Sequence, residues 1–176
     1  MRHWLRAANT RNSVSSALIA AVIIVGTWDQ TTAAFVPDYP AISAKFSQDD
    51  RFVKRIEGIM PAGSMIYQFP YRRFPENGET DYDEARGYLH STTLRWSYGA
   101  MAGTKADDYV KGVINRADLP ATLRNIRTAG YTGLWLHGAF YDDPSAFQTA
   151  VTYFGSVLGR RPIMSDDGSL AFFDLR

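Results

Sequence analysis

The pattern of hydrophobic and polar positions separates the first thirty residues from the rest of the chain. Seventeen uncharged residues lie between Arg11 and Asp29, and no polar face interrupts them. As a helix this segment extends roughly 25 Å, slightly less than a hydrocarbon core of ~30 Å. Trp28 lies where a membrane interface favours an aromatic ring. The pattern predicts a membrane anchor over residues 1–30.

The charges around this segment predict its orientation. Arg2, Arg6 and Arg11 precede it, and no basic residue follows it closely. Because positively charged flanks stay in the cytoplasm, we expect a single-pass anchor with the N-terminus inside the cell. The alternative is a cleaved signal peptide with Ala17–Val25 as its apolar core. Both interpretations send residues 30–176 out of the cytoplasm.

The next two segments are predicted to be a short linker and a helix. Residues 31–42 contain Pro37 and Pro40, which favour an extended, stiff connection as far as Pro40. From residue 43 to about residue 58, apolar residues recur at helical spacing. These apolar residues are Phe46, Val53, Ile56 and Met60.

The remainder of the chain alternates helical and strand patterns, so residues 43–176 are expected to form one α/β domain. Asp118 and Asp143 are typical N-caps, and Ser165–Gly168 is a strong hairpin signal. The expected helices cover residues 105–116, 119–130 and 144–158, and the expected strands cover residues 65–69, 131–137, 163–164 and 170–175. The fold class that follows is α/β: a small, mostly parallel sheet flanked by helices, with a C-terminal β-hairpin, after one transmembrane helix.

Composition and charge exclude several function classes. The net charge is +1, but residues 1–28 carry +3 and the remainder carries −2, so nucleic acid is not an expected partner. The chain has no cysteine, which removes disulfides and thiolate chemistry. Gly99–Lys105 fails the phosphate-loop spacing, and the three histidines have no metal-ligand spacing. No cofactor and no metal ion are expected.

The candidate binding region is the stretch from Phe69 to Gly99, which is rich in aromatic and charged residues. In its last part a period of two places Leu94, Trp96 and Tyr98 on one face and Arg95 on the other. One interpretation is an edge strand whose aromatic residues fill the core. The other is a groove for an anionic or sugar-like group, since arginine forks match phosphate geometry and aromatic rings stack on sugars. The candidate substrate-binding residues are Tyr71, Arg72, Arg73, Glu76, Asp83, His90, Arg95, Trp96 and Tyr98.

The acidic residues between Glu76 and Glu84 have two interpretations. Such a run is usually a solvated loop or a helix N-terminus, where acids interact favourably with the helix dipole. Asp81 with Glu84 three residues later is a capping-box variant, which predicts a helix from Tyr82 to Leu89 with Tyr88 and Leu89 in the core. Catalysis by one of these acids is the alternative, but no catalytic residue can be assigned.

Several short motifs in a fixed order resemble a known family. They are Asp29-Gln30-Thr31, Phe52-Val53, Ile56-Glu57, Gln68-Phe69-Pro70, Phe74-Pro75-Glu76, Gly87-Tyr88-Leu89-His90-Ser91 and Leu94-Arg95-Trp96-Ser97-Tyr98-Gly99. Together they resemble the C-terminal extracytoplasmic region of bacterial multi-spanning membrane glycosyltransferases of the C-type superfamily. The resemblance covers the chain from about residue 22 to its end. It implies a location in the bacterial inner membrane, with the domain in the periplasm.

In that superfamily the sugar donor is a polyprenyl-phosphate lipid, and the catalytic carboxylate lies on a loop between early transmembrane helices. This sequence has one candidate membrane span and nothing that corresponds to that loop. The resemblance therefore implies an accessory domain, or the C-terminal part of a longer protein, in cell-envelope glycan assembly. The implied partners are membrane lipid, a polyprenyl-phosphate-linked sugar or glycan, and a multi-spanning membrane protein.

Three functional hypotheses follow. The first is a membrane-tethered periplasmic accessory domain of a glycosyltransferase system that has no catalytic core of its own. The second is a structural module that docks on a multi-spanning membrane partner. The third is an independent carbohydrate-active enzyme that uses the acids of residues 76–84. In a fold of this class, a pocket is first expected at the C-terminal ends of the strands.

Overall fold

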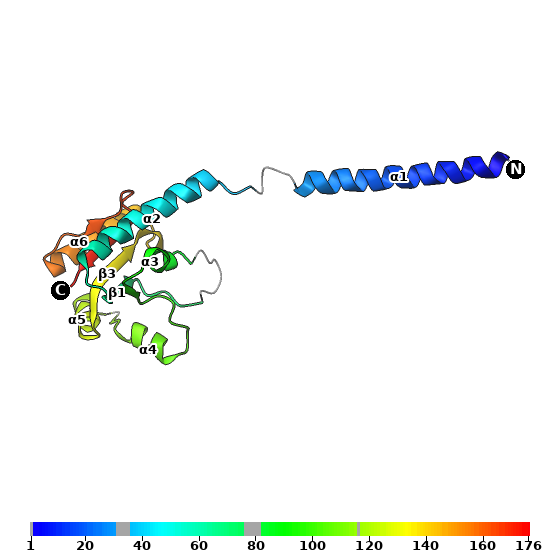
Figure 1. Cartoon of the computed structure of the whole chain (residues 1–176). Coiled ribbons are helices and arrows are strands. Elements are labelled where there is room, and N and C mark those ends of the chain that lie inside the picture. Colours follow the sequence, from blue (N-terminus) through cyan, green and yellow to red (C-terminus); the bar gives the residue numbers. More distant parts are fainter. Residues whose placement is uncertain (1, 31–35, 76–81, 116) are drawn as a thin grey trace. The chain divides into compact units, whose positions relative to one another are not determined.

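The computed structural model describes residues 2–30, 36–75, 82–115 and 117–176 (Figure 1). The chain forms two compact units, residues 1–42 and residues 43–176. The first unit consists mainly of α1 (Arg2–Gln30). Apolar side chains of α1 between Val14 and Trp28 are exposed. None of the helices in the described ranges combines the length and the apolar character needed to cross a membrane. The membrane anchor stays a prediction.

Helix α2 (Tyr39–Ile59) begins before the predicted position. The Asp38 carboxylate accepts a hydrogen bond of 3.0 Å from the Ala41 N–H and thereby caps the helix. Pro40 lies in the first turn of α2. A proline is tolerated there because the backbone nitrogens of the first turn donate no hydrogen bond within the helix. The prediction of an extended chain as far as Pro40 was therefore wrong. Phe46, predicted on the apolar face, is 59% exposed.

A five-stranded mixed sheet forms the centre of the second unit, in the order β2-β1-β3-β5-β4. The pairs β1–β2 and β1–β3 are parallel, whereas β3–β5 and β4–β5 are antiparallel. The α/β class and the final hairpin are confirmed. The prediction of a mostly parallel sheet was wrong, because the sheet has two parallel and two antiparallel pairings. The strands are β1 (Met65–Phe69), β2 (Arg95–Trp96), β3 (Tyr131–His137), β4 (Ile163–Met164) and β5 (Leu170–Asp174).

The helices that follow α2 agree with the predicted bounds only in part. Helix α3 begins at Ala85 and not at Tyr82, without a side-chain cap at Glu84, and α4 ends at Gly112 and not at residue 116; the predicted cap Asp81 lies outside the described residues. Asp118 and Asp143 accept hydrogen bonds from the N–H groups of Ala121 and Ala146, as expected for N-caps. Gly159 ends its helix in the left-handed conformation, with φ of 62°. The helices are α3 (Ala85–His90), α4 (Lys105–Gly112), α5 (Leu119–Thr128) and α6 (Pro144–Leu158), and a 3-10 turn covers Gly138–Phe140.

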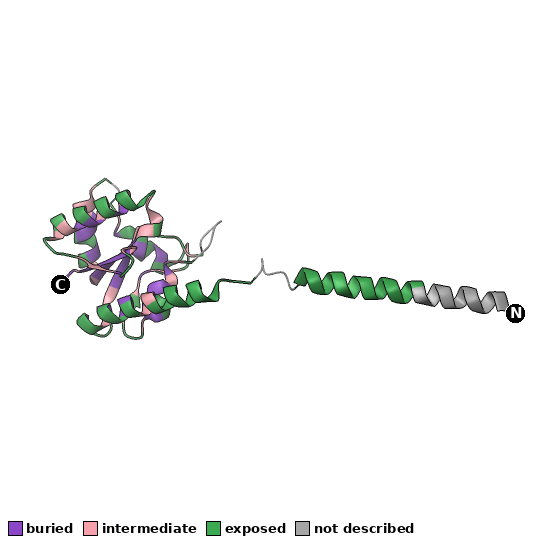
Figure 2. Ribbon diagram, turned by 90° about the horizontal axis from the view of Figure 1, so that it is seen from above, coloured by how far each residue is buried: buried purple, intermediate pink, exposed green. Residues whose placement is uncertain are grey.

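The helices cover both faces of the sheet. Side chains that alternate along the strands form one hydrophobic core on each face. On β1, Ile66 packs with α2 on one face, and Tyr67 packs with α4, α5 and α6 on the other. On β3, Trp135 belongs to the first core and Leu134 to the second. Figure 2 shows the buried residues along the strands and the inner helix faces. The result is a three-layer arrangement.

A substitution in the central strand tests this packing. A Cβ atom added at Gly133 would lie 2.6 Å from Ile66 and 2.6 Å from Phe172, so neither neighbour can accommodate it without shifting. We expect Gly133→Ala to lower the free energy of unfolding by about 1–3 kcal/mol through overpacking. Urea unfolding of the full chain, followed by tryptophan fluorescence, measures this change.

Gly58 provides the matched control. It lies in α2, and an added Cβ would meet nothing within 4 Å. Gly58→Ala should stabilise the chain by roughly 0.5–1 kcal/mol, because alanine loses less backbone freedom in a helix than glycine. Equal effects of the two substitutions would contradict the packing described for β3.

Candidate functional site

A groove of about 830 Å³ runs along the edge strand β2. One wall is the continuous segment Leu94–Ala100. The opposite walls come from α3, through Ala85, Tyr88 and Leu89, and from α4, through Ala106, Tyr109 and Val110. The lining is mostly apolar and aromatic. Such a surface binds apolar ligands or partner proteins more readily than a polar one does.

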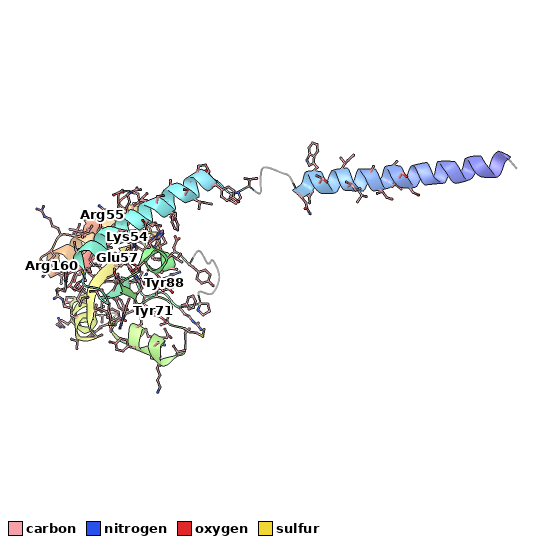
Figure 3. The ribbon with its side chains drawn as sticks, viewed as in Figure 1. Lys54, Arg55, Glu57, Tyr71, Tyr88 and Arg160 are labelled. Atoms are coloured by element: carbon pink, nitrogen blue, oxygen red, sulfur yellow. The ribbon has the colours of Figure 1, made fainter. Side chains whose placement is uncertain are left out.

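Contact between α3 and Trp96 brings two exposed side chains to this groove. A Cβ atom at Gly87 would lie 2.5 Å from the Trp96 ring, so glycine permits the close approach of the helix to β2. Tyr88 and Leu89 directly follow Gly87 in the sequence. Each is 67% exposed and lines the groove. Figure 3 labels Tyr88 beside the edge of the domain. The prediction that these two residues are helix core was wrong.

Glu57 of α2 fixes the segment that leads into β2. Its carboxylate accepts hydrogen bonds from the N–H groups of Thr92 (2.6 Å) and Thr93 (2.8 Å) and from the Ser91 hydroxyl (3.0 Å). Lys54 donates a further bond of 2.9 Å. Burial would raise the pKa of Glu57, but these donors outweigh burial and lower the pKa to about 2. Figure 3 labels Glu57 and Lys54 on α2.

This arrangement predicts a specific pH dependence of stability. Because the folded pKa of Glu57 lies below its ordinary value of 4.5, the stabilisation is complete above about pH 5 and is lost as the pH falls toward 2. Glu57→Gln should lower the free energy of unfolding by roughly 2–3 kcal/mol at pH 7, and the difference from wild type should shrink at pH 2. Urea unfolding at a series of pH values measures it.

Lys54→Met is the matched control, since it removes the exposed partner of Glu57 and leaves the bonds to residues 91–93 in place. An exposed ion pair contributes less than about 1 kcal/mol. A Glu57→Gln variant that differs from wild type equally at pH 7 and pH 2 would contradict the role given to the carboxylate.

A buried polar cluster lies at the C-terminal ends of β1 and β3, next to the groove. Gln68 donates to the backbone oxygen and to the carboxylate of Glu84, both at 2.6 Å, and accepts the Tyr98 N–H at 3.0 Å. Arg86 donates to both carboxylate oxygens of Asp49, one of them at 2.7 Å. All the side chains that make these bonds are at least nine-tenths buried. The cluster joins α2, α3, β1 and the segment after β2.

His137 completes the cluster and is held in one protonation state. Its Nε2 lies 3.0 Å from an Arg86 guanidinium nitrogen, which can only donate, so Nε2 accepts and Nδ1 carries the proton. Burial, followed by the positive charge of Arg86, lowers the pKa of His137 to about 3. The side chain is 1% exposed. The His137 imidazole is buried, and its unprotonated nitrogen already accepts a hydrogen bond from Arg86. It is therefore not arranged for general-base catalysis.

The predicted site residues fall into separate places. Arg95, Trp96 and Tyr98 line the groove. Tyr71 and Arg72 line a much smaller cavity at the C-terminal end of β1, which also includes Tyr98. The Tyr71 hydroxyl donates to Asp107, whose pKa falls to about 2 through this bond and those of Gly103 and Lys111.

The remaining predicted residues have other environments. The Arg72 guanidinium lies 4.6 Å from the centre of the Phe140 ring, and Arg73 is exposed. Asp83 lies 3.9 Å from the Lys45 ammonium. His90 is buried against Phe46, with ring centres 4.3 Å apart. Glu76 lies outside the described residues.

Sequence reasoning missed the residues that complete the groove and the cluster. Tyr109 lies in the helix predicted over residues 105–116, whose weak amphipathic pattern did not show which face is buried. Arg86 and Asp49 are separated by 37 positions and share no sequence signal. Among the residues that the structure describes, no three histidine or acidic side chains are grouped to hold a metal ion.

Comparison of the chain with protein-family models, with curated proteins and with solved structures found no match in any of the three. The family resemblance therefore depends on the short motifs alone.

Proposed function

We propose that this chain is a non-catalytic accessory domain of a bacterial membrane glycosyltransferase system, and that its groove binds a segment of a multi-spanning membrane partner. The observation that carries the proposal is the apolar, aromatic groove along β2, with Tyr88 and Leu89 each two-thirds exposed at its rim. Large apolar side chains left exposed beside a groove are typical of protein–protein contacts. The ordered motifs of the chain support the choice of partner.

The N-terminal unit supports a location at the membrane. The apolar side chains of α1 are exposed along Val14–Val25, and Trp28 follows them with 76% exposure. We propose that α1 holds the chain at the inner membrane with the second unit in the periplasm. Extraction of cell membranes at alkaline pH tests this: the chain should stay in the pellet, and complete release into the supernatant would contradict it.

A pair of substitutions tests the groove as the docking surface. Leu89 on α3 and Val157 on α6 are both exposed apolar residues, but Leu89 lines the groove and Val157 does not. We expect Leu89→Asp to reduce co-purification of a multi-spanning glycosyltransferase, identified by mass spectrometry, at least tenfold. Val157→Asp should leave the yield unchanged. Equal yields from the two variants, or a partner without several membrane spans, would contradict the proposal.

A second candidate ligand is a polyprenyl-phosphate-linked sugar, which the position of Arg95 in the groove favours. An isoprenoid chain suits the apolar lining, and a guanidinium binds phosphate in a bidentate fashion. Titration of the chain in lipid nanodiscs compares a polyprenyl phosphate with the matching polyprenol. This candidate requires tighter binding of the phosphate and loss of that difference in Arg95→Leu. Equal binding of the two lipids would exclude it.

A further inference from the structure

Helix α3 and its N-cap direct ionisable side chains to the interior and large apolar side chains to solvent. Glu84, Arg86 and His90 are each at most 7% exposed, whereas Tyr88 and Leu89 are each 67% exposed. No side chain of α3 belongs to either hydrophobic core of the described residues. This wall of the groove is therefore held in place mainly by polar contacts and very little by apolar burial.

A helix attached in this way is the part of the domain expected to open first, because local opening costs least where few apolar contacts are lost. Two fixed points limit such an opening. Tyr82 has φ of 47°, a left-handed conformation that is unfavourable for a residue with a Cβ atom. On the other side, Glu57 holds residues 91–93. The segment between these points is residues 82–90.

His137 makes the contact between α3 and β3 dependent on pH. Its Nε2 lies 3.0 Å from a guanidinium nitrogen of Arg86. A protonated ring would bring a donor against a donor and a positive charge against a positive charge. Burial is the main reason that the pKa of His137 lies at about 3, and the positive charges of Arg86 and Lys45 lower it further. Once α3 is open, water replaces Arg86 and the pKa returns toward its ordinary value of 6.5.

The charged groups that face this imidazole come from three parts of the domain. The segment of α3 contributes Arg86 and Glu84, whose carboxylate lies 3.9 Å from Nδ1. Helix α2 contributes Lys45 and Asp49, and the turn between β4 and β5 contributes Asp167. The acids favour the imidazolium, but burial and the two bases outweigh them. The closed form therefore binds the proton less tightly than the open form does.

Proton binding favours the open form as the pH falls. Because the pKa of His137 is about 3 in the closed form and 6.5 in the ordinary exposed state, the closed form keeps its full advantage above about pH 7. The ratio of open to closed chains then rises about tenfold for each pH unit between 6.5 and 3. From pH 7.5 to pH 4.5 the ratio should increase roughly a hundredfold.

We infer that α3 is an acid-sensitive gate of the groove, which opens when His137 takes up a proton and Arg86 loses its acceptor. Opening displaces the wall that carries Tyr88 and Leu89, so a partner bound to this wall is released. This inference rests on the proposed function, because it adds control by pH to the same binding site. At neutral pH the wall is closed and the partner stays bound.

Hydrogen exchange of the full chain in lipid nanodiscs measures the opening. Each exchange rate at pH 7.5 and at pH 4.5 is divided by the intrinsic rate at that pH. Protection of α3 should fall at least thirtyfold. Protection of α5, which buries the apolar residues Leu123 and Ile126, should change less than threefold. Constant protection of α3, or an equal loss in both helices, would overturn the inference.

His137→Gln separates the gate from other effects of acid. The glutamine oxygen can still accept from Arg86 but takes up no proton in this range, so α3 should keep the same protection at both pH values. His90→Gln is the control, since His90 lies in α3, 3.7 Å from Asp50, and has no contact with Arg86 in the proposed gate. It should keep the wild-type loss of protection. A loss that persists in His137→Gln, or that disappears in His90→Gln alone, would overturn the role of His137.

The full pH profile of the wild-type chain decides the matter if His137→Gln does not fold. Protection of α3 should begin to fall near pH 6.5, the ordinary pKa of the imidazole. An onset only below about pH 4.5, where carboxylates take up protons, would assign the opening to acidic side chains and overturn the gate.

The two proposals fail in different ways. The gate predicts that wild type loses at least tenfold of the co-purified partner at pH 4.5, and that His137→Gln keeps it. If α3 opens in acid but no multi-spanning partner depends on Leu89 at pH 7.5, the gate stands and the proposed function is overturned. If the partner depends on Leu89 while protection of α3 is independent of pH, only the gate is overturned.

Discussion

Replacing Arg86 with methionine is expected to lower the free energy of unfolding by about 3–5 kcal/mol, because the substitution leaves the Asp49 carboxylate buried without its partner. The side chains of Arg86 and Asp49 are 9% and 5% exposed, so water cannot replace the lost contact. His137 also loses the hydrogen bond that its Nε2 accepts from Arg86. Urea unfolding of the full chain at pH 7 measures the loss.

Two further variants make this prediction specific. Arg161→Met removes an exposed arginine and should change stability by less than about 0.5 kcal/mol. The double variant with Asp49→Leu and Arg86→Met removes both charges, so it should recover much of the stability lost by Arg86→Met alone. A loss below about 1 kcal/mol for Arg86→Met would show that the pair is not buried as described.

Replacing Trp135 with alanine is expected to cost about 3–5 kcal/mol, because it opens a cavity in the core between α2 and the sheet. Trp135 is 1% exposed. Its ring lies 5.2 Å from the Phe52 ring and 5.3 Å from the Trp96 ring, measured between centres. Since Trp96 lines the groove, the substitution should also weaken ligand binding there. Urea unfolding measures the first effect, and the yield of the co-purified multi-spanning partner measures the second.

Trp28→Ala provides the matched control, since Trp28 lies on α1 and is 76% exposed. It should change the unfolding of the second unit by less than about 0.5 kcal/mol. A Trp135→Ala variant that unfolds like Trp28→Ala would contradict the assignment of Trp135 to the core.

The strands and most helix ends were predictable because their signals are local. The segments Met65–Phe69 and Tyr131–His137 are continuous apolar runs of strand length, and both form strands with the predicted limits. Asp118 and Asp143 are capping residues that act within their own helices. Each of these features is determined by residues that are close together in the sequence.

The groove and the polar cluster depend on contacts between residues that are far apart in the sequence. Glu57 bonds to residues 91–93, and Arg86 bonds to His137, 51 positions away. The side chains of Tyr88 and Leu89 are apolar and follow a helical pattern, so the sequence predicts burial. The contact of Gly87 with Trp96 leaves them at the rim of the groove instead.

Photo-crosslinking in living cells tests the central claim most directly. A photoreactive phenylalanine derivative replaces either Tyr88, which lines the groove, or Tyr153, which lies on α6 and is 41% exposed. We predict a crosslink to one multi-spanning membrane protein from position 88 and no such product from position 153. The same product from both positions, or none from position 88, would contradict the assignment of the groove as the binding site.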